Sequence, residues 1–106
     1  MSIMVQEPDI PEPWWDLRRA APQEDEQREV LLAELHREIS PNHLLHGRTV
    51  SVVARSQAND DLLVVMDDKT WAIVHLTWRS APEVPPWPMT TFFDSLSDAI
   101  RAAAAD

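Results

Sequence analysis

The chain has 106 residues, 44% of them apolar and 25% charged, with no cysteine and a formal net charge of −9. This length and composition predict one globular domain with a buried core. Without cysteine, disulfides, thiolate nucleophiles and zinc–thiolate sites are excluded. The negative charge disfavours nucleic acid and anionic membranes as partners and favours a protein with a basic surface, although charge of this kind can also serve solubility alone.

The N-terminal sequence argues against export. It reads MSIMVQEPDIPEPWW and lacks the basic start and apolar stretch of a secretion signal. No apolar run in the chain approaches the roughly 20 residues of a membrane-spanning helix. We therefore expect a cytoplasmic protein.

Residues 1–21 are predicted to form a Pro/Trp-rich N-terminal arm, followed by a single α-β-β-β-α domain over residues 22–106. The first 22 residues contain four prolines, which oppose regular helix or strand. Trp14 and Trp15 are costly to leave in water, so both are expected to dock. They either seal an edge of the protein's own core or anchor a partner, together with the neighbouring Arg18 and Arg19.

A helix is predicted from Pro22 to Ser40. Proline suits the first helical turn, the acidic run at residues 24–26 complements the helix dipole, and Ser40-Pro41 ends the helix. An apolar stripe for packing on a sheet contains Leu32, Leu35 and Ile39. The opposite face is expected to be solvated and contains Glu29, Glu34, Arg37 and Glu38.

Three strands are predicted next, at residues 49–56, 61–66 and 71–78. Their β-branched and apolar composition is typical of strands, and an acidic turn at residues 67–70 returns the chain antiparallel. A second helix closes the chain after a cap at Asp94 or Ser95; its apolar stripe contains Leu96, Ala99, Ile100 and Ala103. The fold class is therefore α+β: a helix, a three-stranded antiparallel meander and a C-terminal helix, with both helices packed on one face of the sheet.

Two segments contain residues without an evident structural reason. In the third strand, His75 shares a face with Trp71 and Ile73, where it is either a satisfied buried histidine or a functional group. Residues 79–93 contain four prolines around Trp87. This stiff loop either packs on the sheet or presents Glu83, Trp87 and Met89 as a preorganised recognition surface.

The segment DDLLVVMDDKTWAIVHLTW, followed by Glu83 and PPWP, resembles a family of small bacterial proteins that share a (W/Y)AxVHLTW…E…PPWP segment. The resemblance covers roughly the second half of the chain. The family has no known activity, so the resemblance implies no functional residue, cofactor or partner.

Motifs for catalysis are lacking. The sequence contains no GxGxxG, Walker, GxSxG, HExxH or EF-hand pattern, and its single glycine makes a phosphate-binding loop implausible. His36, His43 and His46 are clustered, but a predicted proline stop separates the first from the others and their spacing matches no metal site. No catalytic residue, metal or cofactor is predicted.

Two functions of different classes follow. The first is a small acidic protein-interaction module, such as an inhibitor, an immunity-like protein or a regulator. The alternative is a small-ligand-binding protein or minor enzyme with a pocket between the sheet and the Pro-rich loop. Self-association through a sheet edge is a third possibility. The candidate binding residues are His75, Glu83, Trp87, Trp14 and Trp15.

Overall fold

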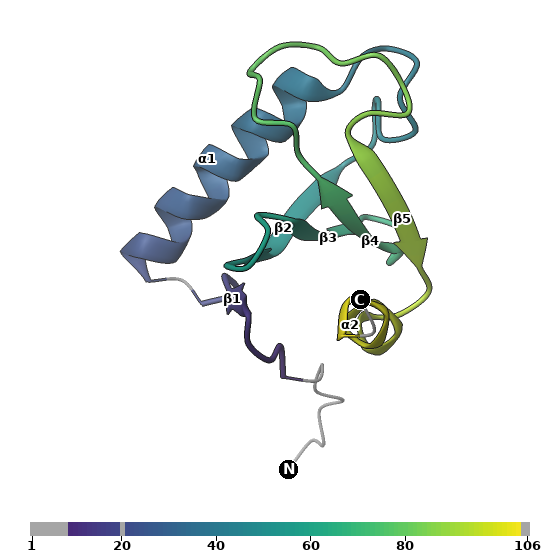
Figure 1. The fold of residues 1–106 in the computed structure, drawn as a ribbon. Helices are drawn as coiled ribbons and strands as arrows, with labels where there is room; N and C mark the ends of the chain where they lie inside the picture. The colour runs from purple at the N-terminus through teal and green to yellow at the C-terminus, as the bar shows by residue number, and fades with distance from the viewer. Residues whose placement is uncertain (1–8, 20, 105–106) are drawn as a thin grey trace.

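The structure is a computed structural model that describes residues 9–19 and 21–104. The described residues form, in order, β1 (Trp14–Asp16), α1 (Pro22–Glu38), β2 (Val50–Ser56), β3 (Leu62–Met66), β4 (Trp71–His75), β5 (Met89–Phe93) and α2 (Leu96–Ala104). The strands pair antiparallel in chain order, so β1 and β5 are the two edges of one sheet (Figure 1).

The prediction of a three-stranded sheet is wrong, although the α+β class fits. The three predicted strands are the central ones, and β1 and β5 extend the sheet to five. Both added strands lie in segments whose prolines argued against regular structure. Each begins directly after a proline and consists of other residues, WWD in β1 and MTTFF in β5. Proline is compatible with edge strands and with strand starts, so its presence nearby did not exclude pairing. Residues 79–88 stay irregular, and we call them the proline loop.

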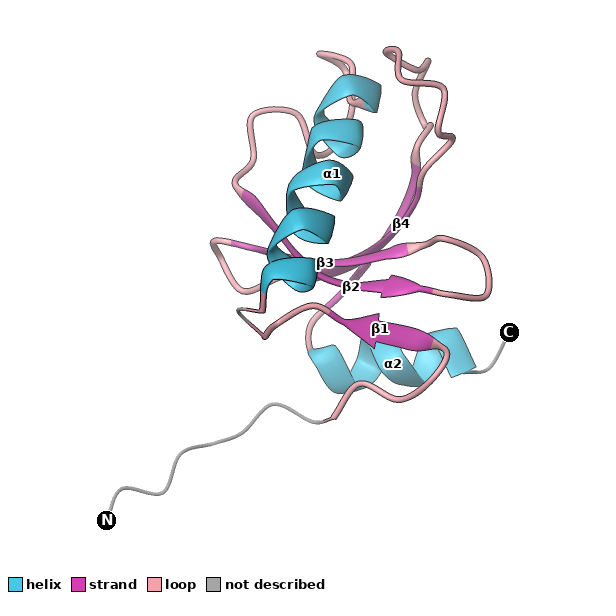
Figure 2. Cartoon of the chain, turned by 90° about the vertical axis from the view of Figure 1, so that its left-hand side faces the viewer, coloured by secondary structure: helices cyan, strands magenta, loops and turns pink. Residues whose placement is uncertain are grey.

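The two helices pack on opposite faces of the sheet, not on one face as predicted. Figure 2 shows α1 in front of the sheet and α2 behind it. The core on the α1 side includes Leu31, Leu35 and Val74, and the core on the α2 side includes Trp71, Leu96 and Ala99. The cause lies in β4, whose alternate side chains are apolar on both faces and therefore need cover on both.

Helix α1 begins where predicted, with Pro22 in its first turn, and ends at Glu38. The predicted stripe faces the core: Leu35 is fully buried, and Leu32 and Ile39 pack against it. The expectation of a solvated opposite face is wrong for Glu34 and Glu38, which are buried. The chain that follows β4 covers these two side chains, a contact that helical periodicity cannot reveal.

A β-bulge in β2 changes which side chains face which helix. The pairing of β2 with β3 shifts between Val52 and Ala54. Val52 belongs to the core beside α1, whereas Val53 and Ala54 both belong to the core beside α2. A bulge adds one residue to one strand and so reverses the alternation beyond it. Arg55 consequently lies on the α1 face.

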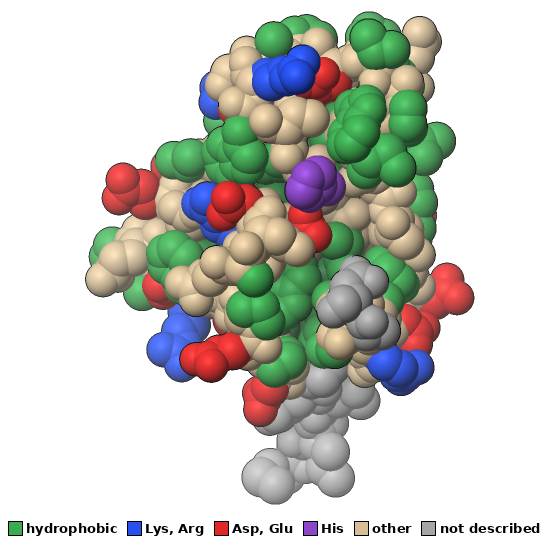
Figure 3. Space-filling view, in the orientation of Figure 1, with side chains coloured by type: hydrophobic (Ala, Val, Ile, Leu, Met, Phe, Trp, Pro, Cys, Tyr) green, Lys and Arg blue, Asp and Glu red, His purple; other side chains and the backbone are tan. Residues whose placement is uncertain are grey.

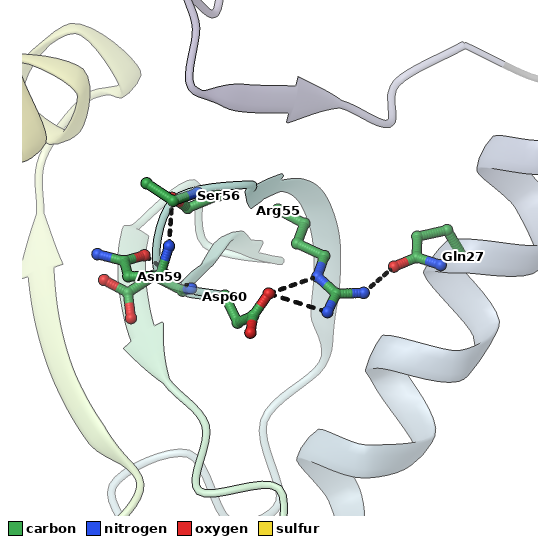
Figure 4. A network of polar contacts seen from close by, with 7 residues as sticks. Gln27, Arg55, Ser56, Asn59 and Asp60 are labelled. Carbon is green, nitrogen blue, oxygen red and sulfur yellow. Dashed lines mark hydrogen bonds and ion pairs between the residues drawn. The ribbon is translucent and has the colours of Figure 1, made fainter.

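Arg55 connects the hairpin of β2 and β3 to α1 (Figure 4). Its Nε and Nη2 groups donate to Asp60 Oδ1 at 3.3 and 3.0 Å, and its Nη1 donates to Gln27 Oε1. The guanidinium also lies over the Trp78 ring, 5.1 Å from its centroid. One side chain thus contacts the β2–β3 turn, α1 and the segment after β4.

Candidate functional site

The polar centre of the α2 face is the pair formed by Asp61 and His75. Asp61 immediately precedes β3, and His75 is the last residue of β4; the antiparallel register that pairs Leu62 with Val74 places them opposite each other. His75 Nδ1 lies 2.6 Å from Asp61 Oδ1. The His75 side chain is about half exposed, and within the described residues its Nε2 has no hydrogen-bond partner. The carboxylate therefore fixes the ring and leaves Nε2 available.

A groove of about 760 Å³ extends from this pair across the sheet, between β1 and α2. Its apolar and aromatic lining includes Trp14, Ile73, Phe93 and Ile100, while Asp61 and His75 lie among its polar lining residues. Helix α2 has nine residues and is therefore about 13 Å long, too short to cover the whole face. The uncovered part is the groove.

The bulge in β2 also supplies a polar residue to this groove. Because the alternation reverses beyond the bulge, Ser56 faces the α2 side and lines the groove. Its Oγ accepts hydrogen bonds from the backbone N–H groups of Ala58 and Asn59, at 3.2 and 3.4 Å. Ser56 is buried and already holds the β2–β3 turn, so it is a structural hydroxyl and not a free nucleophile.

The proline loop and the first residue of β5 expose an apolar patch beside the groove. Val84, Trp87 and Met89 are 78%, 44% and 44% exposed. We call these three residues the apolar patch. Figure 3 shows hydrophobic side chains gathered over the proline loop and the adjoining part of β5. The Trp87 ring contacts the His75 ring with centroids 6.5 Å apart, so the patch and the groove adjoin.

A buried histidine holds this loop in place. His43 Nε2 lies 2.8 Å from the carbonyl oxygen of Pro88, and His43 Nδ1 accepts the backbone N–H of Leu45 at 3.0 Å. These two partners require the tautomer with the proton on Nε2. His36 and His46 are exposed, and no group of three His, Asp or Glu side chains in the described part of the chain is arranged to hold a metal ion.

Two buried carboxyl groups fix the chain after β4. Glu38 accepts the N–H groups of Thr77 and Trp78, both at 2.8 Å, and Glu34 accepts the N–H and the hydroxyl of Ser80, both at 3.0 Å. Trp78 and Ser80 have φ angles of 62° and 57°, in the left-handed region that is unfavourable for residues other than glycine. The acceptors of α1 thus stabilise a strained backbone.

The two carboxyl groups also perturb each other. The pKa of Glu34 is lowered to about 2, chiefly by its hydrogen bond with Glu38 and further by Ser80 and Arg37. The pKa of Glu38 is raised, chiefly by burial and further by Glu34. Of the two, Glu38 is therefore the carboxyl group that takes up a proton first as the pH falls. Perturbed carboxyl pairs are typical of catalytic sites, but both side chains here are buried under the segment that they hold, so we assign them a structural role.

The structure separates the five residues predicted as a binding surface. His75 and Trp87 are in contact, and Trp14 lines the same groove as His75. Trp15 packs against the α1-side core instead. Glu83 accepts the hydroxyl of Thr77 at 2.6 Å, and its N–H donates to the carbonyl oxygen of Glu38. The groove lies against β1 and α2, away from Glu83.

Sequence reasoning missed Asp61 as the partner of His75, although a signal was present. A hairpin pairs residues at equal distances from its centre, and Asp61 and His75 each lie seven residues from Asp68, on which the pairing of β3 with β4 is centred. It also missed the free edge of β5 and the bonding of His43. Prediction of the β5 edge required recognition of a strand after the prolines. Prediction of the His43 hydrogen bond required knowledge of its contact with Pro88, 45 residues away in sequence.

Comparison with known proteins assigns neither a family nor a function: no family model matches the sequence, and no curated protein or solved structure matches it significantly. Neither helix in the described ranges combines the length and apolar character needed to cross a membrane.

Proposed function

We propose that this protein is an interaction module that binds an extended, basic segment of another protein along the free edge of β5. The observation that carries the proposal is the contrast between the two sheet edges. Edge strands are normally protected by shortness, proline, charge or a covering element, because their unpaired backbone groups recruit other strands.

The edge at β1 has such protection. The strand contains only three residues, a proline directly precedes it, and it ends in the charged Asp16. The edge at β5 is longer and less protected. Its sequence, MTTFF, contains no charge and no proline, and Met89 and Phe92 are exposed. Among the described elements, none lies beyond β5 (Figure 1).

The apolar patch extends this edge. Val84 and Trp87 belong to the proline loop that leads into β5, where the N–H of Trp87 donates to the carbonyl oxygen of Val84 at 3.1 Å. A bound strand would gain backbone hydrogen bonds from β5 and side-chain contacts from this loop. Loop residues already fixed by His43 lose little conformational entropy on binding.

Charge selects the kind of partner. The protein carries −9 overall, and the exposed Asp94 directly follows β5. A second copy of the chain would bring the same charge to the edge, whereas a segment rich in Lys or Arg would be attracted. The proposed occupant is therefore a basic segment of another protein.

The test is selection from a random peptide display library, comparing the wild type with Phe92→Lys. Lysine on an edge strand opposes strand addition. We expect the selected peptides to contain alternating apolar residues and added Lys or Arg. They should bind the wild type at least tenfold more tightly than Phe92→Lys, and they should shift the amide NMR signals of residues 89–93.

A matched control is Val30→Lys, which places the same charge at an exposed apolar residue of α1, since Val30 and Phe92 are 47% and 37% exposed. It should leave binding within about twofold, because a distant surface charge is largely screened. Selected peptides that bind Phe92→Lys as well as the wild type would overturn the proposal. A concentration-dependent dimer that Phe92→Lys abolishes would replace it with self-association.

A further inference from the structure

We propose that the groove between β1 and α2 binds a small organic cation, an amine with an aliphatic or aromatic body. This groove lies on the face of the sheet that α2 partly covers, whereas the proposed strand site is the outward edge of β5; Met89 contributes to both the groove and the apolar patch. Its volume of about 760 Å³ is within the range of small-molecule sites, roughly 300 to 1,000 Å³.

The charge of the ligand follows from the lining. Asp61 and Glu12 line the groove, and no Lys or Arg does so among the described residues. Asp61 is largely buried, with a side chain 19% exposed, so water screens its charge less than that of a surface carboxylate. An anionic ligand would meet two carboxylates and no basic side chain other than the His75 ring, which Asp61 already holds. An ammonium group carries three donors and no acceptor, so it matches the Asp61 carboxylate.

The body of the ligand follows from the remaining lining. Trp14 and Phe93 provide aromatic surfaces and Ile73 and Ile100 provide aliphatic ones. Aromatic faces attract cations as well as apolar groups. His75, fixed by Asp61 through Nδ1, adds Nε2 as a hydrogen-bonding atom. The groove therefore combines an apolar floor with a polar end that favours positive charge.

The experiment uses three probes of equal body and different head group: 4-phenylbutylamine, 4-phenylbutanol and 4-phenylbutyrate. Binding is followed by NMR through the indole N–H of Trp14 and the amides of Ile73, His75 and Ile100. We expect the amine to bind about tenfold more tightly than the alcohol, a difference typical of one charge-assisted contact, and the carboxylate to bind most weakly.

Two variants assign the charge effect. Asp61→Asn keeps the size of the side chain and should reduce the amine's advantage over the alcohol to within about threefold. Asp67→Asn removes the same charge from the exposed β3–β4 turn and should leave that advantage intact. Equal binding of the three probes, an amine advantage that persists in Asp61→Asn, or shifts confined to residues outside the groove would each overturn the inference.

Discussion

Glu34 and Glu38 are one helical turn apart and equally buried, yet replacing each with glutamine should have unequal effects. Glu34 is the ionised member, with a pKa lowered from the usual 4.5 to about 2. At about 1.4 kcal/mol per pKa unit, this corresponds to about 3 kcal/mol of stabilisation at neutral pH. Glutamine cannot carry that charge, so Glu34→Gln should lower the free energy of unfolding by about 3 kcal/mol.

Glu38→Gln should cost about 1 kcal/mol or less. The pKa of Glu38 is raised, and a glutamine amide resembles the protonated carboxyl because its NH₂ group can donate to Glu34. The loss is one of the two acceptors for the N–H groups of Thr77 and Trp78, and a net hydrogen bond contributes about 1 kcal/mol. Removal of a group that is costly to ionise when buried partly offsets this loss.

The pH dependence separates the two roles. The pKa of Glu34 is depressed on folding, so its contribution is complete above about pH 4.5 and is lost as the pH falls towards 2. The pKa of Glu38 is raised, so protonated Glu38 favours folding at low pH, and that contribution is lost as the pH rises through its folded-state pKa. The deficit of Glu34→Gln should therefore be smaller at pH 3 than at pH 7.

Urea unfolding followed by tryptophan fluorescence, at both pH values, measures these differences. Equal losses for the two variants at pH 7, or a larger loss for Glu38→Gln, would refute the assignment of the lowered pKa to Glu34 and the raised pKa to Glu38. A Glu34→Gln deficit that does not change between pH 7 and pH 3 would refute the origin of the stabilisation in ionised Glu34.

Two further predictions concern the segment between α1 and β2. His43→Ala should lower the free energy of unfolding by about 2 to 4 kcal/mol, because it leaves the Leu45 N–H and the Pro88 carbonyl without their partner. The control is His46→Ala, at an exposed site. Equal losses for the two variants in urea unfolding would contradict the role of His43 in holding the proline loop. Gly47→Ala should lower the free energy of unfolding by about 1 kcal/mol. The cause is the backbone φ of 78° alone, since an added Cβ meets nothing within 4 Å. An unchanged midpoint of urea unfolding would contradict this prediction and show that the backbone at residue 47 relaxes.

Sequence reasoning located the central structure well. The apolar alternation of β4 correctly placed Trp71 and Ile73 on one face and Val74 on the other, and the stripe of α2, including Leu96 and Ala99, packs as expected. The cap of α2 is Ser95, whose Oγ accepts the N–H of Asp98 at 3.1 Å. These features depend on residues close in sequence, where periodicity and capping rules apply directly.

The failures share a different cause. The edge strands and the burial of Glu34 and Glu38 depend on segments distant in sequence, such as Ser80, which bonds Glu34 from 46 residues away. Amphipathic analysis assigns a glutamate to solvent unless another element covers it. The same limitation applies to the candidate site, in which His75 was identified from its unusual position and Asp61 was not.

The bulge in β2 lets this strand contain one extra residue while its pairing with β3 continues on both sides. β1 pairs with the part of β2 beyond the bulge, where Trp14 is opposite Ser56 and Trp15 is opposite Arg55. Trp14 therefore faces the groove, and Trp15 faces α1. Val53 is the extra residue, because Val52 pairs with Val64 and Ala54 pairs with Leu63. Deleting Val53 would keep both pairs, so Ser56, Arg55 and the two tryptophans would stay on their present faces. The bulge thus absorbs one residue of β2 without exchanging the residues that face the groove.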